Sequence, residues 1–452
     1  MSAARKQSRQ TRREGQSLVY GVGKTGLSIA RYLRRVDASA IYVDSRRQPP
    51  GLEELEALQP HADIVLGTPN PALLKDIARL IVSPGISDRD PFVIAARAAG
   101  IDVVSDIELF VEQARAPFVA ITGSNGKSTV TTLVALMCEA AGLSALAGAN
   151  LGEPALDLLA HAAPDAYVLE LSSFQLQRTR YLPAKVAALL NISADHLDWH
   201  SDEAEYRAAK YRIYRDAQAA VWNRADSDSQ RWLPDTGSVR SFGLDTPREG
   251  AYGILDLAGQ RCLARGKSRL KACDELALVG IHNQANALAA LAVGELLGLD
   301  DAAMLAVLSS FRGLPHRMQF VARVAEVDYV NDSKATNVAA AVASVQSLDT
   351  PVVLIAGGQG KGGNFAVLAD AVHARLRAAV LIGADAAAIE RAFAGRVNVL
   401  HAATMPAAVA RATSLAQPGD TVLLAPACAS FDQFANYMER GAAFAAAAEA
   451  LA

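Results

Sequence analysis

The sequence predicts an α/β fold in which several parallel sheets follow one another along the chain. Strands and alanine-rich helices alternate throughout, and two glycine-rich turns each lie between an apolar strand and a helix. Such alternation is typical of parallel sheets covered by helices. The 452 residues are too many for one core, at roughly 150 residues per domain. We therefore expect three domains, namely a Rossmann-like N-terminal domain, a central P-loop ATPase-like domain and a Rossmann-like C-terminal domain.

Composition and charge restrict the possible functions and locations. The net charge of −3 gives no general case for binding nucleic acid, so any phosphate binding must be local. The four cysteines are widely spaced and form no CxxC pair, which favours reduced thiols in a cytoplasm. No apolar run approaches the roughly 18 residues that a membrane span needs. Residues 1–16 are basic but lack an apolar segment, so we expect a flexible tail and no signal peptide.

The first domain, expected over residues 17–113, opens with a dinucleotide-binding pattern. A strand at 17–20 runs into the turn Gly-Val-Gly-Lys-Thr-Gly of residues 21–26, a helix follows, and a second strand ends at Asp44. Glycines at this spacing let a backbone approach a diphosphate, and the acidic residue is placed for a ribose or base. Later strands are expected at 80–82 and 101–104. The pattern predicts a nucleotide site of unspecified kind.

The second domain, expected over residues 114–313, begins with a phosphate-binding turn. A strand at 119–122 is followed by Gly-Ser-Asn-Gly-Lys-Ser-Thr and a helix at 130–141, although the strict pattern has glycine where this chain has Ile121. Backbone N–H groups and a helix N-terminus in such a turn bind phosphates. The alternative is a helix N-cap with a chance Gly-Lys-Ser. We predict an ATP site formed by Gly123, Ser124, Asn125, Gly126, Lys127, Ser128 and Thr129.

Polar side chains end two further strands of the central domain. The strand at 166–169 leads to Glu170, and the strand at 186–190 leads to His196. With Ser128 they offer ligands for one or two hard divalent ions. A salt-bridged Glu170 or a turn-capping His196 are the alternatives. Lys210 lies on a polar helical stretch at 202–216, where the pattern alone predicts a solvated surface lysine.

The third domain, expected over residues 314–452, follows a linker at 313–317. Strands are expected at 327–330, 352–356, 379–382 and 421–424, with polar clusters after three of them. Lys334, Lys361 and Ser430 in these clusters suit a small polyanion such as an amino-acid dicarboxylate. Before this domain, Asn283 and Asn286 could contact an adenine edge or cap the apolar helix expected at 287–297, and the sequence leaves both open.

Six motifs, in this order along the chain, resemble those of the Mur ligases of peptidoglycan synthesis. They are GSNGKST (123–129), ELSSFQL (170–176), HNQANA (282–287), GLPHR (313–317), NDSKATN (331–337) and PACASFDQF (426–434). The resemblance runs from about Leu18 to Leu451. Within the family, the motifs are most similar to those of the ligases that add D-glutamate.

This resemblance implies ATP-dependent amide formation in the cytoplasm. The L-alanine carboxylate of UDP-N-acetylmuramoyl-L-alanine would accept the γ-phosphoryl group, and the amine of D-glutamate would displace phosphate from the acyl phosphate. The implied partners are small molecules only, without nucleic acid or membrane. We expect a monomer that uses ATP and two Mg²⁺ ions.

The resemblance also implies roles for residues that the motifs place in register. Ser128 and Glu170 would ligate one magnesium ion, and His196 with a carbamylated Lys210 the second. The implied catalytic residues near the phosphoryl group that is transferred are Lys127, Asn150, Ser172, His196 and Lys210. The nucleotide would also contact Asn283, Asn286, Arg317 and Asp332. The glutamate carboxylates would contact Lys334, Thr336, Lys361 and Ser430, and the uridine end Lys24, Thr25, Asp44, Ser45 and Arg46.

Three departures concern the glutamate end, and several alternatives stay open. Ala425 stands where the family often has serine, Tyr437 stands where it often has phenylalanine, and the loop after Gly358 reads Gln-Gly-Lys-Gly-Gly, which is richer in glycine than usual. A ligase for another amino acid would keep the UDP-sugar, whereas a folate polyglutamate synthase should lack the 21–44 uridine site. A nicotinamide oxidoreductase built on the 21–26 turn would leave Lys127 unexplained. A non-enzymatic nucleotide-sensing module would need no pair of metal ions.

Overall fold

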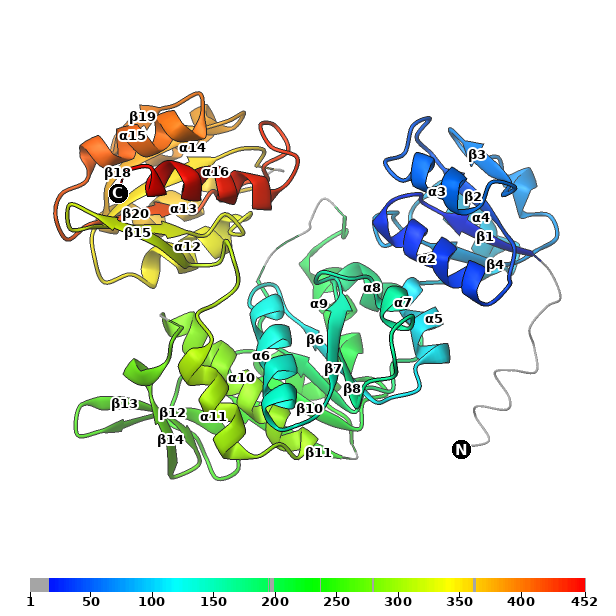
Figure 1. Ribbon diagram of the computed structural model, residues 1–452, viewed down its shortest axis with the longest axis horizontal. Helices are drawn as coiled ribbons and strands as arrows, with labels where there is room; N and C mark the ends of the chain where they lie inside the picture. Colours follow the sequence, from blue (N-terminus) through cyan, green and yellow to red (C-terminus); the bar gives the residue numbers. More distant parts are fainter. Residues whose placement is uncertain are drawn as a thin grey trace.

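The computed structural model describes residues 16–193, 195, 199–235, 237–278, 280–360 and 363–451. Within these residues the strands form three sheets of five, nine and six strands, which follow one another along the chain. Figure 1 shows the N-terminal and C-terminal sheets on the same side of the central one. The expected three-domain α/β fold is confirmed. The boundaries at 113/114 and 313/314 stay predictions.

The N-terminal sheet is parallel, with the order β3-β2-β1-β4-β5. The chain leaves β1 toward β2 on one side and later returns to β4 on the other, so the β1/β4 boundary is a topological switch point. The short edge strand β3 was not predicted. The strands are β1 (Gln16–Tyr20), β2 (Ala40–Asp44), β3 (Ile64–Leu66), β4 (Ile77–Val82) and β5 (Asp102–Val104). The helices are α2 (Lys24–Arg35), α3 (Leu52–Leu58), α4 (Pro91–Ala98) and α5 (Asp106–Gln113), with the 3₁₀ turn η1 (Pro71–Leu74).

The central sheet is parallel from β7 to β12 and ends in an antiparallel extension. Its order is β14-β13-β12-β11-β10-β9-β6-β8-β7, so β6 lies between β8 and β9. The loops that follow these three strands therefore meet at one edge of the sheet. The strands are β6 (Phe118–Thr122), β7 (Ala145–Ala149), β8 (Ala166–Glu170), β9 (Val186–Leu189), β10 (Ala219–Asn223), β11 (Ser238–Phe242), β12 (Tyr252–Leu257), β13 (Gln260–Arg265) and β14 (Ser268–Ala272).

The helices of the central domain correct two predictions. The apolar helix begins at Ile281 instead of Ala287, so Asn283 and Asn286 lie inside it, and the stretch 202–216 divides into a helix and a 3₁₀ turn. The helices are α6 (Lys127–Ala140), α7 (Ala155–Leu158), α8 (Ser173–Arg178), α9 (Glu203–Tyr211), α10 (Ile281–Leu297) and α11 (Asp301–Ser310). The 3₁₀ turns are η2 (Arg212–Tyr214), η3 (Ser227–Trp232) and η4 (Cys273–Glu275).

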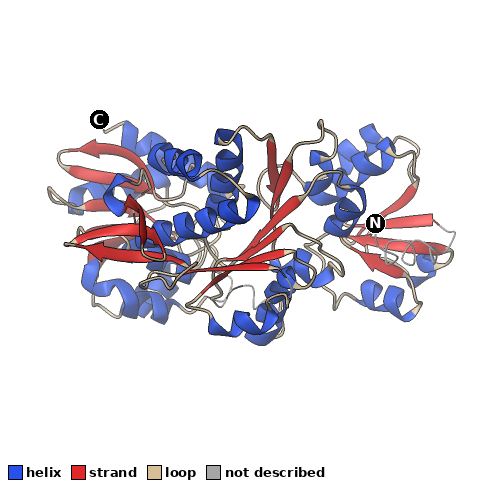
Figure 2. Ribbon diagram, turned by 90° about the horizontal axis from the view of Figure 1, so that it is seen from below, coloured by secondary structure: helices blue, strands red, loops and turns tan. Residues whose placement is uncertain are grey.

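The C-terminal sheet has the order β15-β16-β20-β17-β18-β19, parallel except for the β15–β16 pair. Its strands are β15 (Gln319–Val324), β16 (Val327–Asn331), β17 (Val352–Gly357), β18 (Leu376–Ile382), β19 (Asn398–His401) and β20 (Thr421–Leu424). Its helices are α12 (Val338–Gln346), α13 (Phe365–Val372), α14 (Ala386–Phe393), α15 (Met405–Leu415) and α16 (Tyr437–Glu449), with the turn η5 (His373–Arg375). Figure 2 shows helices on both faces of this sheet.

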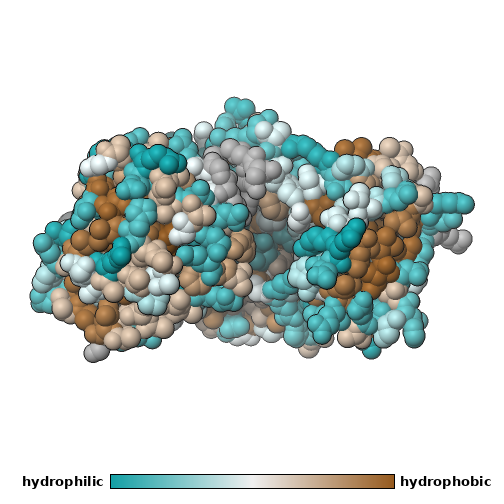
Figure 3. Space-filling model, turned by 90° about the horizontal axis from the view of Figure 1, so that it is seen from above, coloured by the Kyte–Doolittle hydropathy of each residue, from teal (hydrophilic) through white to brown (hydrophobic). Residues whose placement is uncertain are grey.

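Two of the three domains share a hydrophobic cluster, whereas the C-terminal domain has hydrophobic clusters of its own. One cluster joins the N-terminal and central domains and contains, for example, Tyr42 and Leu55 together with Tyr167 and Leu189. The C-terminal domain has two clusters of its own, one on each face of its sheet. Seen from above, the two outer domains flank a hollow (Figure 3). No helix within the described residues is long and apolar enough to cross a membrane.

Candidate active site

The glycine-rich turn after β6 forms a tight loop, of the kind that binds phosphates, and leads directly into α6. Gly126 precedes the helix with a φ of 81°, a conformation that favours glycine. A Cβ at this position would lie 2.3 Å from Asn286 Oδ1, so the loop packs tightly against the first turns of α10. The N-cap of α10 is Gly280, which has no side chain that could cap the helix. The alternative that Asn283 or Asn286 caps the helix is therefore wrong.

Side chains from the neighbouring strand end hold the loop in place. Asn191, which follows β9, accepts a hydrogen bond from Asn125 N at 2.8 Å and donates one to Asn125 O at 3.0 Å. Ser124 Oγ contacts Ser193 O at 3.0 Å and Tyr206 OH at 2.8 Å. Asn191 and Tyr206 were not predicted as site residues. A polar residue directly after a strand was the signal for Asn191, whereas Tyr206 gave none.

Lys127 folds back over the loop that carries it. Its Nζ donates to Gly123 O at 2.7 Å and to Ser124 O at 2.9 Å. Burial lowers the pKa of Lys127, while Glu170 and Asp195 act in the opposite direction. A phosphate bound against the loop would place a negative charge next to this buried ammonium.

Ser128, Glu170 and Asn150 form a compact cluster beside Lys127. Ser128 Oγ donates to Glu170 Oε2, and Asn150 Nδ2 donates to Glu170 Oε1 at 2.5 Å. Glu170 is 3% exposed, which fits a carboxylate poised for a cation better than a surface ion pair. The alternative that Glu170 forms a salt bridge has no support among the described residues, since no lysine or arginine is recorded within ion-pair distance of it.

Lys210 corrects the expectation of a solvated surface lysine. It is 2% exposed, because the end of α9 packs onto the phosphate loop and directs Nζ to Gly123 O at 2.8 Å. Burial, and then repulsion by Lys127, lowers the pKa of Lys210 well below its ordinary value. The amine is thus biased toward its neutral, nucleophilic form.

Three further predicted residues are Ser172 and His196 of the central site and Lys361 of the C-terminal site. Ser172 is the N-cap of α8, where its Oγ accepts from Gln175 N at 3.2 Å in a capping box. Within the described residues no three His, Cys, Asp or Glu side chains gather as a metal site. Ser128 and Glu170 have the oxygen donors that Mg²⁺ prefers, and a carbamate on Lys210 would add another. His196 and Lys361 lie outside the described residues.

The C-terminal domain reaches the phosphate loop through a residue of the linker. Arg317 Nη2 donates to Ser128 Oγ at 2.6 Å. Asp332 is 8% exposed and accepts from Ser344 Oγ at 2.5 Å, and burial raises its pKa to about 6. Burial, and then repulsion by Arg317, lowers the pKa of Lys334 to about 8. The charges of Glu170 and Lys127 in the central domain also act on the pKa of Lys334, the first raising it and the second lowering it.

The loops predicted to bind an amino acid converge at one edge of the C-terminal sheet. β16 and β20 pair in parallel, and the loops after them meet where Ala427 N donates to Ala335 O at 2.9 Å. Lys334 lies over the Tyr437 ring at 4.1 Å. Ser430 is 3% exposed on the second loop, and Thr336 is half-buried on the first.

A buried arginine that was not predicted joins these two loops. Arg440 is 1% exposed and donates to Ser333 Oγ at 3.0 Å, to Ser333 O at 2.9 Å and to Cys428 O at 3.1 Å. Its position within a helix gave no sequence signal.

The N-terminal turn places its predicted residues around one carboxylate. Asp44 Oδ2 accepts from Val22 N at 2.7 Å, and Arg46 binds the same carboxylate through Nη2 at 2.8 Å. These bonds lower the pKa of Asp44 against the effect of its burial. Lys24 and Ser45 are exposed, and Thr25 is half-buried in the first turn of α2.

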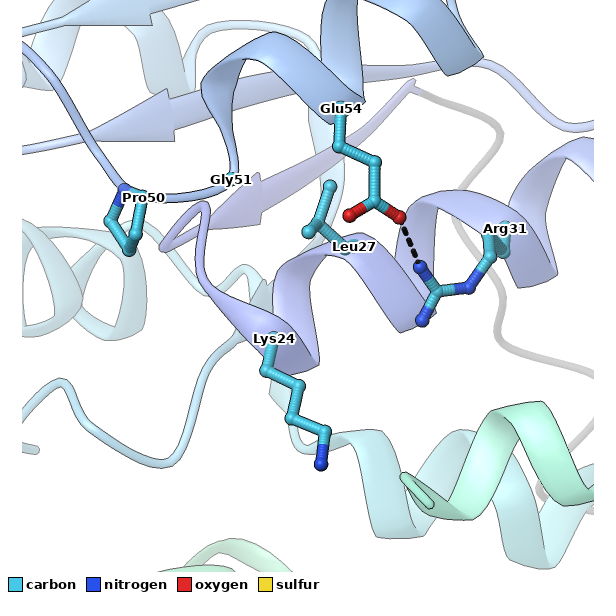
Figure 4. Close-up of a pocket in the computed structure, with 6 residues that line it drawn as sticks. All are labelled: Lys24, Leu27, Arg31, Pro50, Gly51 and Glu54. Carbon is cyan, nitrogen blue, oxygen red and sulfur yellow. Dashed lines mark hydrogen bonds and ion pairs between the residues drawn. The ribbon is translucent and has the colours of Figure 1, made fainter. Parts of the chain in front are cut away.

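A pocket between α2 and α3 adjoins this turn. Figure 4 shows it, with Arg31 paired to Glu54 at 2.8 Å and with Lys24 pointing away from that pair. Lys24 Nζ instead donates to Gly152 O of the central domain at 2.5 Å. The lining residues are Lys24, Leu27, Arg31, Pro50, Gly51 and Glu54.

Comparison with known proteins finds three domain models of one family along the chain. Residues 15–105 match the model of the Mur ligase MurD-like N-terminal domain, residues 121–294 that of the Mur ligase middle domain, and residues 316–428 that of the Mur ligase glutamate ligase domain. Among solved structures, the UDP-N-acetylmuramate-alanine ligase MurC of Thermotoga maritima has a TM-score of 0.60 at 17% identity and covers 97% of this chain and 100% of its own. The MurF ligase of the same organism, in complex with ADP, has a TM-score of 0.59 at 17% identity and covers 98% and 97%.

Full-length relatives are much closer in sequence. The UDP-N-acetylmuramoylalanine–D-glutamate ligase of Nitrosococcus oceani is 47% identical over 430 residues, which are 95% of this chain and 95% of that protein. The ligase of the same name from Pseudomonas aeruginosa is 47% identical over 439 residues, covering 96% of this chain and 98% of its own. An identity of this size over nearly the whole length, with all three domains in register, shows that the chain belongs to the Mur ligase family.

Proposed function

We propose that this protein joins D-glutamate to UDP-N-acetylmuramoyl-L-alanine in an ATP-dependent reaction of cytoplasmic peptidoglycan precursor synthesis. The observation that carries the proposal is the 47% identity, over 95% of the chain, to an enzyme named for this reaction. The convergence of the phosphate loop, the Glu170 cluster and Lys334 on one region supports it.

The reaction proceeds in two steps, and in each step one bond forms and one bond breaks. The carboxylate of the L-alanine unit attacks the γ-phosphorus of ATP, which forms an acyl phosphate and releases ADP. The unprotonated amine of D-glutamate then attacks the acyl carbon, the C–O bond to phosphate breaks, and one proton and inorganic phosphate leave. Each step needs a region shielded from water, because water would otherwise hydrolyse the acyl phosphate.

The phosphate loop and its neighbours bind ATP in this proposal. Backbone N–H groups of residues 123–129 and the N-terminus of α6 hold the phosphates, and Lys127 turns from the loop carbonyls to the outer phosphates. Arg317, Asp332, Asn283 and Asn286 complete the nucleotide site from α10 and from the C-terminal domain. Asn150 and Ser172 lie beside the transferring group.

Magnesium fits the donor atoms of the same region. Ser128 and Glu170 would hold one ion, and His196 with a carbamylated Lys210 a second. Bound there, the ions supply charge neutralisation for the phosphoryl oxygens. Formation of the carbamate joins the neutral Lys210 amine to carbon dioxide with release of one proton, which the lowered pKa of Lys210 favours.

The two outer domains supply the acceptor and the amine. The uridine end of the UDP-sugar lies at Lys24, Thr25, Asp44, Ser45 and Arg46. The carboxylates of D-glutamate are held by Lys334, Thr336, Lys361 and Ser430. The enzyme acts as a monomer on small molecules, which light scattering of the purified protein would test.

An amino-acid panel with ATP and the UDP-sugar tests the proposal. Phosphate release should require both the UDP-sugar and D-glutamate, and the product should carry one added glutamate by mass spectrometry. Release that ignores D-glutamate, or that follows L-glutamate equally well, would reject the assignment. Tight binding of NADH without binding of ATP would support a nicotinamide oxidoreductase instead.

A further inference from the structure

A buried arginine of the central domain extends into the N-terminal domain. Arg178 ends α8, and its side chain is 2% exposed. Nε donates to Asp88 Oδ1 at 2.7 Å, Nη1 donates to Ser83 O at 3.0 Å, and Nη2 donates to Ile86 O. One guanidinium thus fixes both the backbone and a side chain of a single segment, residues 83–88, in the other domain.

That segment forms one side of the crevice at the topological switch point. It follows β4, the neighbour of β1, and ligands of open α/β sheets bind between the loops of two such strands. Ser83 Oγ donates to Gly21 O at 3.0 Å, so the 83–88 segment rests directly on the 21–26 turn. A Cβ on Gly21 would lie 2.8 Å from Ser83 Cβ, which leaves little freedom between the two walls.

The same short helix begins next to the phosphoryl-transfer cluster. α8 starts at Ser173, three residues after Glu170, and Arg178 lies at its other end. Trp199 supports the arginine, with the guanidinium 5.9 Å from its ring centre, and Phe174 packs on Trp199 at 4.4 Å. The short helix α8 therefore links the cluster, at its N-terminal end, to the 83–88 segment, at its C-terminal end.

We propose that Arg178 is a positioning residue that fixes the 83–88 segment as the second wall of the UDP-sugar site and aligns it with the Glu170 cluster. The inference deepens the proposed function and rests on it, because it assigns the crevice to the UDP-sugar. Arginine suits this task, since its planar fork satisfies several acceptors at once, which a lysine ammonium does in a looser geometry.

Two other arginines serve as controls that distinguish this role from a general contribution to the contact between the domains. Arg180 binds Asp102 at 2.7 Å and Glu108 at 2.8 Å across the same boundary, but its side chain is 58% exposed and it has no recorded contact with residues 83–88. Arg97 binds the same Asp88 oxygen at 3.0 Å from within the N-terminal domain. Arg180→Gln tests loss of an interdomain ion pair, and Arg97→Gln tests loss of charge beside Asp88.

Calorimetric titration of UDP-N-acetylmuramoyl-L-alanine into the full-length protein, without ATP or D-glutamate, tests the proposal. Arg178→Gln should weaken binding by about tenfold or more, because a fork of charge-assisted hydrogen bonds is lost. Arg180→Gln and Arg97→Gln should stay within about twofold of the wild type. Arg178→Lys should remain weak, since one ammonium does not satisfy all three acceptors.

Steady-state kinetics should show the same separation. In Arg178→Gln the KM for the UDP-sugar should rise while the KM for ATP stays unchanged, which also shows that the central domain is folded. If this variant does not fold, Asp88→Asn weakens the same segment from the other side and should raise the KM for the UDP-sugar alone.

Each outcome supports or overturns one proposal. Wild-type protein that does not bind the UDP-sugar rejects the proposed function. Wild-type protein that binds it, together with an Arg178→Gln variant of unchanged affinity, rejects the positioning role and leaves the proposed function standing. Full rescue by Arg178→Lys, or equal losses in Arg180→Gln, also overturns the positioning role.

Discussion

At the scale of single residues, Lys127 is held by the loop whose ligand it is expected to bind. Its ammonium contacts two carbonyl oxygens of that loop, at 2.7 and 2.9 Å. We predict that Lys127→Ala lowers kcat by about 10²- to 10³-fold, as expected for loss of a charge that stabilises a transferring phosphoryl group. Calorimetry should show that affinity for the UDP-sugar is retained. A variant with near-normal turnover would contradict this role.

Lys210 makes a separate prediction, because a buried amine is unusual beside a phosphate site. Its lowered pKa favours the neutral amine that reacts with carbon dioxide. Lys210→Ala should be poorly active and should recover partly when short carboxylic acids are added, since a free carboxylate can take the place of the carbamate. Initial rates with and without acetate or propionate measure this. Full activity without rescue would exclude the carbamate.

Lys334 predicts a pH dependence for binding of the amino acid. With a pKa of about 8, its ammonium loses the proton as pH rises through that value, and its attraction for a carboxylate is then lost. The KM for D-glutamate should therefore rise above about pH 8. Lys334→Arg keeps its charge over this range, so the rise should move to higher pH. The titration of the substrate amine is common to both proteins, and equal pH profiles would contradict the role of Lys334.

At the scale of elements, the start of α6 depends on one glycine. Gly126 has a φ of 81°, and Asn286 Oδ1 lies 2.3 Å from where a Cβ would be. Gly126→Ala should weaken ATP binding, because the backbone strain of about 1 kcal/mol adds to the steric clash. The double variant Gly126→Ala/Asn286→Ala removes the clash and keeps the strain, but it also removes the amide that is proposed to contact the nucleotide. Titration with a non-hydrolysable ATP analogue should rank Gly126→Ala below the wild type, and equal affinities would contradict the expected close packing.

At the scale of the whole molecule, the division of the cores predicts how the protein unfolds. The N-terminal and central domains share one hydrophobic cluster, whereas the clusters of the C-terminal domain contain residues of that domain alone. The contacts recorded across its boundary include single polar bonds such as Asn337 Nδ2 to Asp195 Oδ2 at 3.1 Å. Calorimetry should resolve two transitions, and a fragment of residues 314–452 should reproduce one of them. One transition for the full-length protein, together with no unfolding transition for the fragment, would contradict this division.

The sequence by itself determined the fold class and most of the loops that carry chemistry. Strand-to-helix alternation and glycine-rich turns act locally, because a turn next to a strand end needs only its own residues to take shape. The strands at 421–424 and 118–122 were predicted within one residue, and the phosphate loop was found with its helix. Glu170 and Ser128 were predicted to act together and do lie in contact.

The tertiary structure alone decided which side chains are buried and which elements face each other. The residue pattern alone places Lys210 on a solvated helix face, but Lys210 is buried, because α9 packs on the phosphate loop through a contact between residues 87 positions apart. Arg178 binds Ser83, which lies 95 positions away in the sequence. Arg440 links two loops from within a helix. Helical periodicity does not carry such information, since desolvation and hydrogen bonding at a position depend on chain segments that only folding brings there.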